Sequence, residues 1–356
     1  MKKNFIGILF CIAVLFSACS KESFNSSALL NPAPPENIQA NGLPLLTNMW
    51  TARSPFPAHD PREGACTFVI GAKAYMFGGY QAAYKKDLWE FNPSTNTWTQ
   101  KASLPAAARA RTQAVAFSIN GKGYIATGNA EWNPQDGEKL KDVWEYDPVS
   151  NSWTKKADLP GLARGSAVAF AINGKGYIVG GSDYATDAQM DDVWEYDPIA
   201  NSWTSKGIWS APGKDMGRHD AVAFVINNKA YVGTGAGSAP TKSLLKDFWE
   251  YNPATNTWTQ KTDFPGGNRG CAAGFASSTL GYVGIGFYGK PDDENTYYSQ
   301  DFWSYDPATD KWTKRPVFPG TGTIKSTSFF VAGNGYLGMG HSPASNNTNE
   351  FYRYIP

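Results

Sequence analysis

Asp142-Val-Trp-Glu-Tyr-Asp-Pro-Val-Ser-Asn-Ser-Trp-Thr154 is the stretch of sequence that decides the fold. Its Trp and Tyr residues favour β-strands over helices. Asp147-Pro148 separates the two aromatic segments, and such a pair is typical of a tight turn. The stretch therefore predicts two short antiparallel strands, one around Trp144 and one around Trp153, joined by that turn.

This stretch is repeated along the whole chain at a regular spacing. Trp-Thr pairs recur 48 to 55 residues apart, at Trp50, Trp98, Trp153, Trp203, Trp258 and Trp312. A second Trp stands nine residues before each of the last five, at Trp89, Trp144, Trp194, Trp249 and Trp303. The chain ends on a weaker copy, Glu350-Phe-Tyr-Arg-Tyr-Ile-Pro356. A period of this length with several short strands is typical of the blades of a β-propeller.

Each repeat divides into four strands. In the second copy we expect an innermost strand at Ala114–Phe117, a hairpin turn at Asn120-Gly121 and a second strand at Gly123–Gly128. The third strand is Val143–Tyr146, and the outer strand carries Trp153-Thr154. Small residues recur in the innermost strands, which crowd around the axis, whereas the bulky Trp residues belong to the wider outer strands.

The repeats resemble kelch repeats, in the glycine that ends the second strand, the Tyr-Asp-Pro of the third strand and the Trp of the outer strand. The kelch double glycine is intact at Gly78-Gly79 and Gly180-Gly181, and elsewhere only its second glycine is present, at Gly128, Gly235, Gly286 and Gly340. The resemblance covers residues 48–356 and extends to galactose-oxidase-type propellers. It implies an all-β, six-bladed kelch-type β-propeller with four-stranded blades.

The repeat count also predicts how the ring closes. The last copy, residues 320–356, has three strands but no Trp-Thr strand, and the first Trp-Thr pair, at Trp50, has no blade before it. We therefore expect the N-terminal strand to supply the outer strand of the last blade, which leaves the ring without an open end. The predicted propeller domain spans residues 47–356.

The N-terminus has the features of a secretory signal. Lys2 and Lys3 precede an apolar run, Phe5–Phe16, that is too short to span a membrane. Cys19 follows small residues and resembles the acylated cysteine of a bacterial lipobox, although Phe16 stands where such boxes prefer Leu. We predict a signal peptide at 1–18 and lipidation of Cys19; the alternative is an ordinary cleaved signal with an incidental cysteine.

The segment that follows predicts an anchored, extended tether. Residues 19–46 are rich in Pro and Asn, and such polar sequence buries little apolar surface. Ser20-Lys21-Glu22 resembles the export tag of surface lipoproteins in Bacteroidetes-type bacteria. The expected location is the outer membrane, facing the periplasm or the cell surface, with the lipid at Cys19 as the contact with the membrane.

Composition narrows the possible partners. The chain of 356 residues has 32 Lys and Arg against 31 Asp and Glu, for a net charge of +1. This balance argues against a nucleic-acid partner and against a polybasic membrane patch. We expect a glycan or an envelope protein as the partner, bound by a monomeric propeller.

One face of the predicted ring is the default binding surface. The loops between second and third strands are long and differ from blade to blade, whereas the turns on the opposite face are short and repetitive. Diverse loops on a rigid scaffold commonly carry binding sites. We call the first face the loop face and the second the turn face.

An arginine begins the innermost strand in five blades, at Arg62, Arg111, Arg164, Arg218 and Arg269, and Lys325 lies near the corresponding place in the sixth. One hypothesis places these side chains around the channel mouth as a cationic ring for a carboxylate, sulfate or phosphate. The alternative is that each arginine pairs within its own blade, for instance with Glu90, Glu145, Glu195 or Glu250. Repetition with the fold favours the structural alternative.

Other candidate residues fall on the loop face. His219 with Glu131 is the best acid–base pair, and Trp132, Tyr184 and His341 are candidate ligand contacts. The three histidines and four cysteines show no metal-binding spacing, so no metal or other cofactor is expected. Cys66 and Cys271 fall in blades that are not neighbours, which predicts two free, buried thiols in the innermost strands.

Three functions remain open from the sequence. The first is an envelope-anchored binding module that uses the loop face to bind a glycan or a protein. The second is a sugar-modifying enzyme, because bacterial kelch-type propellers include N-acetylneuraminate epimerases. A copper oxidase is disfavoured by the scarcity of His and by the positions of the cysteines. The third is a structural subunit of an envelope complex.

Overall fold

The computed structural model describes residues 47–57, 60–130, 140–183, 188–210, 216–237, 243–289, 297–342 and 346–356. The predictions on the signal peptide, the tether and Cys19 lie outside these residues, as do those on Glu131, Trp132 and Tyr184. Within the described part of the chain, no helix is long and apolar enough to span a membrane.

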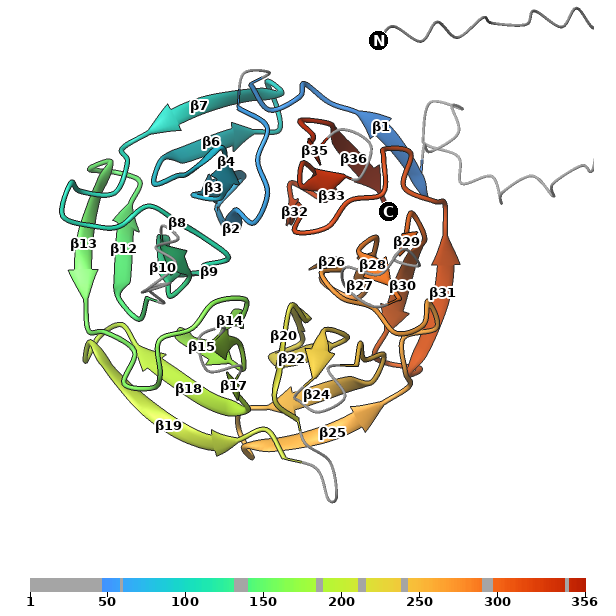
Figure 1. The fold of residues 1–356 in the computed structure, drawn as a ribbon. Helices are drawn as coiled ribbons and strands as arrows, with labels where there is room; N and C mark the ends of the chain where they lie inside the picture. Colours follow the sequence, from blue (N-terminus) through green and yellow to red (C-terminus); the bar gives the residue numbers. More distant parts are fainter. Residues whose placement is uncertain are drawn as a thin grey trace, which may run out of the picture. The chain divides into compact units, whose positions relative to one another are not determined.

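Six four-stranded antiparallel sheets surround a central axis, as the sequence predicts (Figure 1). The strands of each blade are given from the axis outward. Blade 1 consists of β2 (Cys66–Ile70), β3 (Lys73–Phe77), β6 (Leu88–Asn92) and β7 (Thr97–Lys101), and blade 2 of β9 (Val115–Ile119), β10 (Lys122–Ala126), β12 (Val143–Asp147) and β13 (Ser152–Lys156). Blade 3 consists of β14 (Val168–Ile172), β15 (Lys175–Val179), β18 (Asp192–Asp197) and β19 (Ser202–Ile208). Blade 4 consists of β21 (Val222–Ile226), β22 (Lys229–Gly233), β24 (Phe248–Asn252) and β25 (Thr257–Lys261), and blade 5 of β26 (Ala273–Ala276), β27 (Gly281–Gly284), β30 (Phe302–Asp306) and β31 (Lys311–Arg315). Blade 6 consists of β32 (Thr327–Val331), β33 (Asn334–Gly338), β36 (Phe351–Ile355) and β1 (Met49–Ala52).

Two-residue strand pairs extend the blades at the loop face. They are β4 (Tyr80–Gln81) with β5 (Ala83–Tyr84), β8 (Arg111–Thr112) with β11 (Asn129–Ala130), β16 (Ser182–Asp183) with β17 (Ala188–Gln189), β20 (Arg218–His219) with β23 (Ala236–Gly237), β28 (Phe287–Tyr288) with β29 (Tyr297–Tyr298), and β34 (His341–Ser342) with β35 (Asn346–Asn347). In blades 2 and 4 these pairs join the residues before the innermost strand to the loop after the second strand. In the other four blades the pair is a hairpin within that loop, and an isolated bridge makes the same connection.

The closure prediction is confirmed. β1 pairs antiparallel with β36, with Trp50 opposite Tyr354 in the register. Figure 1 shows β1 on the outer edge of the blade that the C-terminal strands form. The Trp50 ring packs against Phe302 and Phe318, with centroid distances of 4.9 and 5.3 Å. The N-terminal strand thus completes blade 6 and also joins it to blade 5.

The outer-strand tryptophans also fasten neighbouring blades together. Trp153 Nε1 donates to the Ala102 carbonyl at 2.7 Å, and the Ala102 amide donates to the Asn151 side chain at 3.0 Å. The same carboxamide oxygen accepts from the Tyr146 hydroxyl at 2.8 Å. Asn151 and Trp153 therefore provide hydrogen-bond partners for the amide and the carbonyl of Ala102, where the chain leaves the preceding blade. This role explains why the Asn-x-Trp pattern recurs.

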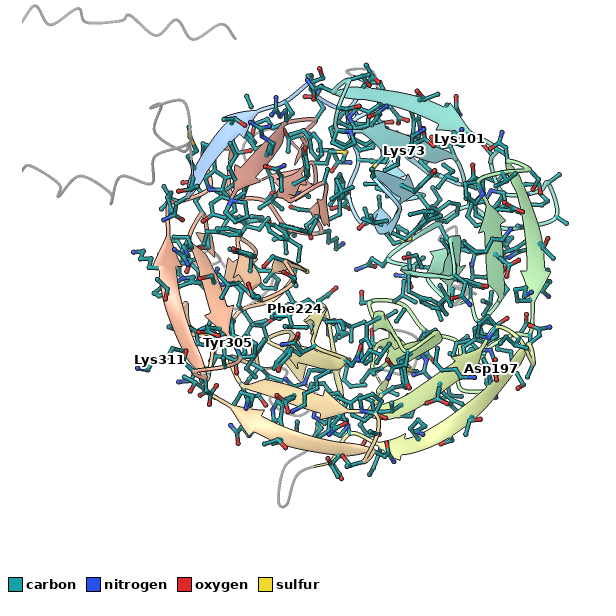
Figure 2. The ribbon with its side chains drawn as sticks, turned by 180° about the vertical axis from the view of Figure 1, so that it is seen from behind. Lys73, Lys101, Asp197, Phe224, Tyr305 and Lys311 are labelled. Atoms are coloured by element: carbon teal, nitrogen blue, oxygen red, sulfur yellow. The ribbon has the colours of Figure 1, made fainter. Side chains whose placement is uncertain are left out.

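Glycine is required where the blades press closest together. A Cβ on Gly281 would lie 2.0 Å from the ring of Phe224 in the preceding blade, and a Cβ on Gly123 would lie 2.1 Å from the ring of Phe68. Phe224 of blade 4 and Tyr305 of blade 5, both labelled in Figure 2, belong to one buried apolar cluster. This wedge packing makes a rigid ring, and the ring positions the loop face.

Candidate functional site

The five repeated arginines are buried inside their blades, with at most 2% of each residue exposed. The guanidinium of Arg111 binds the carboxylate of Asp142 in a bidentate manner, with Nη1–Oδ1 and Nη2–Oδ2 distances of 2.6 and 2.8 Å. Nη1 also donates to the Thr127 carbonyl at 3.1 Å. The other bidentate pairs are Arg62–Asp87, Arg164–Asp192, Arg218–Asp247 and Arg269–Asp301.

These pairs confirm the favoured alternative, in which each arginine pairs within its own blade, and they correct the two other expectations. The arginines do not form a cationic ring at the channel mouth, because their side chains are enclosed within the blades. Their partner is the aspartate that precedes or begins each third strand, and not Glu90, Glu145, Glu195 or Glu250. The two oxygens of the aspartate meet the planar guanidinium fork, and Oδ2 also accepts from the third-strand indole, as Asp142 does from Trp144 at 2.6 Å. The glutamates instead accept from the tyrosine hydroxyls of the second strands.

The bidentate pair needs an ionised carboxylate, and the surroundings of Asp142 keep its carboxyl ionised. Burial alone would raise the pKa of its carboxyl, but the hydrogen bonds and charge of Arg111 and the indole of Trp144 hold it below the usual range. The sequence carried a signal for this pair: the five blades with the arginine all have the aspartate, and blade 6 has Thr323 and Glu350 in the two places.

The residues that do surround the axis lie two positions after the arginines. They are Gly64, Gln113, Ser166, Asp220, Cys271 and Lys325, and each has a positive φ, between 51° and 65°. Five backbone hydrogen bonds of 2.8 to 3.1 Å link them in succession from Lys325 through Gly64 to Cys271, each amide donating to the carbonyl of the preceding blade. We call these six residues the axial ring.

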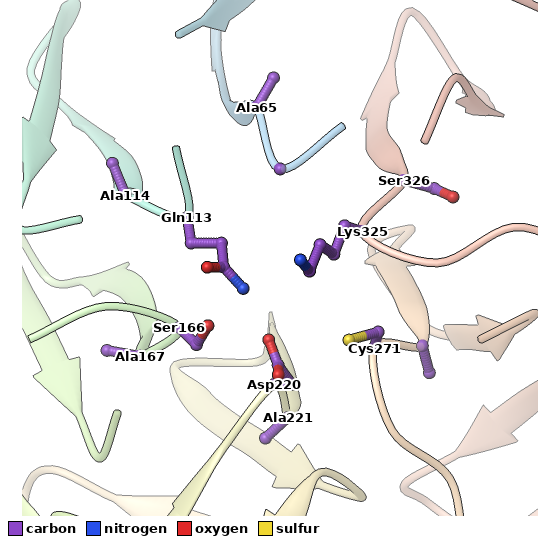
Figure 3. Close-up of a pocket in the computed structure, with 12 residues that line it drawn as sticks. Ala65, Gln113, Ala114, Ser166, Ala167, Asp220, Ala221, Cys271, Lys325 and Ser326 are labelled. Carbon is purple, nitrogen blue, oxygen red and sulfur yellow. The ribbon is translucent and has the colours of Figure 1, made fainter. Parts of the chain in front are cut away.

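The axial ring encloses a pocket of about 190 Å³ on the loop face. Small residues that directly precede the innermost strands, such as Ala65, Ala167 and Ala221, also line it. Figure 3 shows the side chains of Gln113 and Lys325 reaching toward each other across the opening. Asp220, Ser166 and Cys271 complete its wall (Figure 3). The left-handed backbone of the ring residues turns these side chains inward, and strand alternation alone does not predict this.

The pocket holds charges of both signs. The His219 Nδ1 atom lies 2.8 Å from Oδ2 of Asp220. Burial would raise the pKa of Asp220, but its hydrogen bond with His219 and its attraction to His219 and Lys325 hold the pKa below the usual range. Burial would lower the pKa of Lys325, but attraction to Glu63, whose carboxylate is 3.9 Å away, raises it. The mouth therefore presents a stable ammonium and a stable carboxylate.

Gln113 adds directed hydrogen-bonding capacity. Its Oε1 accepts from Asn129 at 2.6 Å, which fixes the orientation of the amide. Its Nε2 is buried and has no hydrogen-bond partner among the described residues. An amide donor without a partner beside a lysine favours an acceptor-bearing ligand.

Exposed aromatic rings stand on the loops around the pocket. Tyr288 and Tyr297 stack with their centroids 5.4 Å apart, and 43% and 52% of these residues are exposed. Tyr80 is also exposed and packs edge-on against Tyr84. Of the candidate ligand contacts, His341 begins β34 and bridges to Ile324, next to the axial ring, and Lys325 belongs to the ring itself. Lys325 is the one predicted cation that reaches the pocket.

His219 lies beside the axial ring, and its carboxylate partner among the described residues is Asp220. The described part of the chain holds no cluster of three or more His, Cys, Asp or Glu residues that could bind a metal ion. Cys66 and Cys271 are free thiols, as predicted; Cys271 is buried, as expected, whereas Cys66 is half-buried. Burial raises the pKa of Cys66 to about 12 and that of Cys271 well above its usual value, so both are poor nucleophiles.

Several known proteins resemble this chain. The Kelch-like protein terF of Aspergillus terreus is 23% identical over 273 residues, which cover 73% of this chain and 57% of that protein. Kelch-like protein 35 of Mus musculus is 26% identical and covers 75% of this chain and 41% of that protein. The N-acetylneuraminate epimerase of Yersinia pestis is 30% identical over 159 residues, which are 34% of this chain and 40% of the enzyme. The chain thus spans about half the length of these relatives.

Structural and family comparisons agree with the repeats. The structure described as "Structure of YjhT" superposes with a TM-score of 0.68 over 85% of this chain and 96% of that one, at 18% identity, and this likeness concerns the fold alone. The model of the KLHDC2/KLHL20/DRC7 Kelch-repeats domain matches residues 43–235 and 166–334. The chain therefore belongs to the kelch-repeat family and folds as a six-bladed β-propeller.

Proposed function

We propose that this protein is an envelope-anchored binding module that holds a glycan or a protein partner at its loop face, with the axial pocket at the centre of the site. The observation that carries the proposal is the polar pocket of the axial ring, where Lys325, Asp220 and the amide of Gln113 converge. Fixed donors and acceptors within a rigid ring suit recognition because little conformational freedom is lost on binding.

The chemistry of the mouth favours a glycan over a protein surface. A pocket of about 190 Å³ accepts one sugar ring or a short side chain but not a folded element. Sugar hydroxyls both donate and accept, which matches a site with a carboxylate, an ammonium and an amide. The exposed rings of Tyr288 and Tyr297 lie on the loops of the same face and provide flat surfaces for the rest of a saccharide.

A glycan array and an affinity capture on the full chain test this function together. We expect retention of a set of polar saccharides, with at least a tenfold loss of affinity in Asp220→Asn. Capture of an envelope protein instead, again dependent on Asp220, would make the partner a protein. Binding of neither, or binding that Asp220→Asn leaves unchanged, would contradict the loop-face module.

The envelope anchor forms the second part of the proposal. Lys2, Lys3 and the apolar run before Cys19 support a lipoprotein signal. Cys19→Ala should move the protein from the membrane fraction to the soluble fraction and abolish labelling with a palmitate analogue. Equal fractionation of the wild type and the variant would remove the lipid anchor from the account and leave the binding site unaffected.

A second candidate function is a sugar-modifying enzyme that resembles N-acetylneuraminate epimerase. The observation that favours it is the His219–Asp220 couple beside Lys325, because proton transfer at a sugar carbon needs such acid–base groups. The partial match to the Yersinia pestis enzyme supports the same substrate class. Proton NMR of N-acetylneuraminate with the wild type and with His219→Gln tests it; epimerisation that persists in the variant, or none in either protein, would eliminate this assignment.

A further inference from the structure

Four blades repeat a cluster of charged residues next to the second strand, near the turn face. In blade 1, Glu90 accepts from Lys73 at 2.7 Å and from the hydroxyl of Tyr75 at 2.8 Å. Lys101 on the outer strand lies 3.7 Å from the same carboxylate. Figure 2 shows Lys73 and Lys101 on blade 1 from this side. In blades 2 to 4 the second-strand tyrosine likewise donates to a glutamate, and an outer-strand lysine lies 3.3 to 3.8 Å from that carboxylate, at Glu145, Glu195 and Glu250. The second-strand lysine pairs with the glutamate again in blade 4, whereas in blades 2 and 3 it pairs with Asp147 and Asp197.

Blade 6 inverts the charge at the position of the carboxylate. Arg353 is the register partner of Tyr336, as Glu90 is of Tyr75. The outer cation is retained, because the amide of Arg53 donates to the Phe351 carbonyl at 2.9 Å, at the same step of the strand pair as Lys101. Two arginines therefore stand where the first four blades place a lysine and a glutamate.

No acid compensates this pair within the described residues. Neither Arg53 nor Arg353 forms an ion pair there, and Arg353 Nε donates to the hydroxyl of Thr51 at 3.2 Å. Both residues are partly buried. Burial and the nearby charge of Arg53 together lower the pKa of Arg353, which is the signature of an uncompensated cation.

A groove opens beside Arg353, on the turn face between blades 6 and 1. Its volume is about 400 Å³, and it is lined in part by Arg353, Tyr336, Asn334, Lys73, Asn92 and Ser94. Side chains with N–H or O–H donors dominate this lining, and a carboxylate is not among the residues that form it. A guanidinium in such a setting suits an oxyanion, because its planar fork can donate to two oxygens at once.

We propose that this groove binds an oxyanion, a phosphate or sulfate group, with Arg353 as its principal donor and Arg53 as a second charge behind it. Next to Arg353, the bound anion supplies the negative charge that a glutamate supplies in each of the first four blades. It stabilises the blade that the N-terminal strand closes. The groove opens on the turn face and the axial pocket on the loop face, so an oxyanion leaves the axial pocket free for its own ligand.

Thermal melts of the full chain test the oxyanion site. Inorganic phosphate or sulfate should raise the wild-type melting temperature by about 2 °C or more over chloride at equal ionic strength, as ligand binding to the folded state requires. Arg353→Glu rebuilds the arrangement of blades 1 to 4. It should melt higher than the wild type in chloride and lose the response to phosphate.

Lys311→Glu is the matched control, since it makes the same change of charge at an exposed site on the outer strand of blade 5. We expect it to keep the full phosphate response. A wild type that responds equally to chloride and phosphate would overturn the site, and so would an Arg353→Glu variant that retains the shift.

A second comparison of melting temperatures distinguishes a phosphate group on a carrier molecule from the free phosphate ion. Glycerol 3-phosphate stands in for a lipid headgroup or another phosphoryl carrier, and inorganic phosphate for the free ion. A larger Arg353-dependent shift with glycerol 3-phosphate would assign the site to a carrier-bound phosphate, and equal shifts would assign it to the free anion. Because Arg353 and Asp220 lie on opposite faces, these melts and the glycan assays can fail independently.

Discussion

At the scale of single residues, the structure separates the repeated charges from the unrepeated ones. The arginines repeat with the fold and bind an aspartate inside each blade, as Arg164 does with Asp192. The charges that face the pocket do not repeat: only blade 4 contributes Asp220 and only blade 6 contributes Lys325. Charged residues that repeat from blade to blade therefore stabilise the scaffold. Axial-ring residues that differ from blade to blade are the ones available to contact a ligand.

Arg164→Ala should destabilise the fold. The substitution leaves the carboxylate of Asp192 without its partner, and loss of one member of a buried pair costs about 3–5 kcal/mol. Since 27% of the Asp192 side chain is exposed, we expect the lower end, about 3 kcal/mol, in chemical denaturation. Arg164→Lys keeps the charge without the fork and should lose less. A change below about 1 kcal/mol for Arg164→Ala would mean that the pair is not structural.

The same pairs predict acid sensitivity. Burial opposes ionisation of the aspartates, but their arginines hold the pKa values of Asp87, Asp142, Asp192 and Asp301 below those of the unfolded chain. Their contribution to stability is therefore complete above about pH 5 and is lost as the pH falls through the folded-state pKa values. The free energy of unfolding should fall between about pH 5 and 2, with a shallower slope in Asp192→Asn. A constant or rising stability over that range would contradict the assignment.

At the scale of the elements, the repeated stretch defined the strands closely. The third and outer strands expected around Trp144 and Trp153 are β12 and β13, which extend the prediction by a few residues. The pairing of β1 with β36 could be predicted because it follows from counting strands. The axial ring could not, since its residues combine positive φ values with contacts between blades, and neither has a periodic signal in the sequence. The favoured pairing of each arginine within its own blade is confirmed, but its partner was predicted wrongly, because strand alternation gives a face and not a partner.

Deletion of residues 47–56 should lower the melting temperature sharply. The deletion removes β1 and with it the packing of Trp50 on Phe302 and Phe318, and it exposes the edge of β36. Substitution of Trp50 by Ala in the intact chain is the graded comparison and should produce a smaller decrease. If the deleted protein melted at the temperature of the wild type, blade 6 would not depend on the N-terminal strand.

At the scale of the whole molecule, the ring displays two faces with different chemistry. The loop face has an axial pocket with charges of both signs and exposed tyrosines on its loops. The turn face has short turns and, between blades 6 and 1, a groove beside an arginine that has no acidic partner in the described chain. One rigid scaffold thus carries the proposed recognition site and, on its other face, the proposed anion site.

The measurement that tests the central claim most directly is a calorimetric titration with the saccharide or protein that the loop-face assays recover. The titration compares the wild type with Lys325→Met and Asp220→Asn, and with the turn-face control Lys311→Glu. We predict a loss of affinity of tenfold or more in both pocket variants, because each removes a charge-assisted hydrogen bond at the mouth, and no change in the control. Equal affinity in all four proteins would contradict the claim that the axial pocket is the binding site.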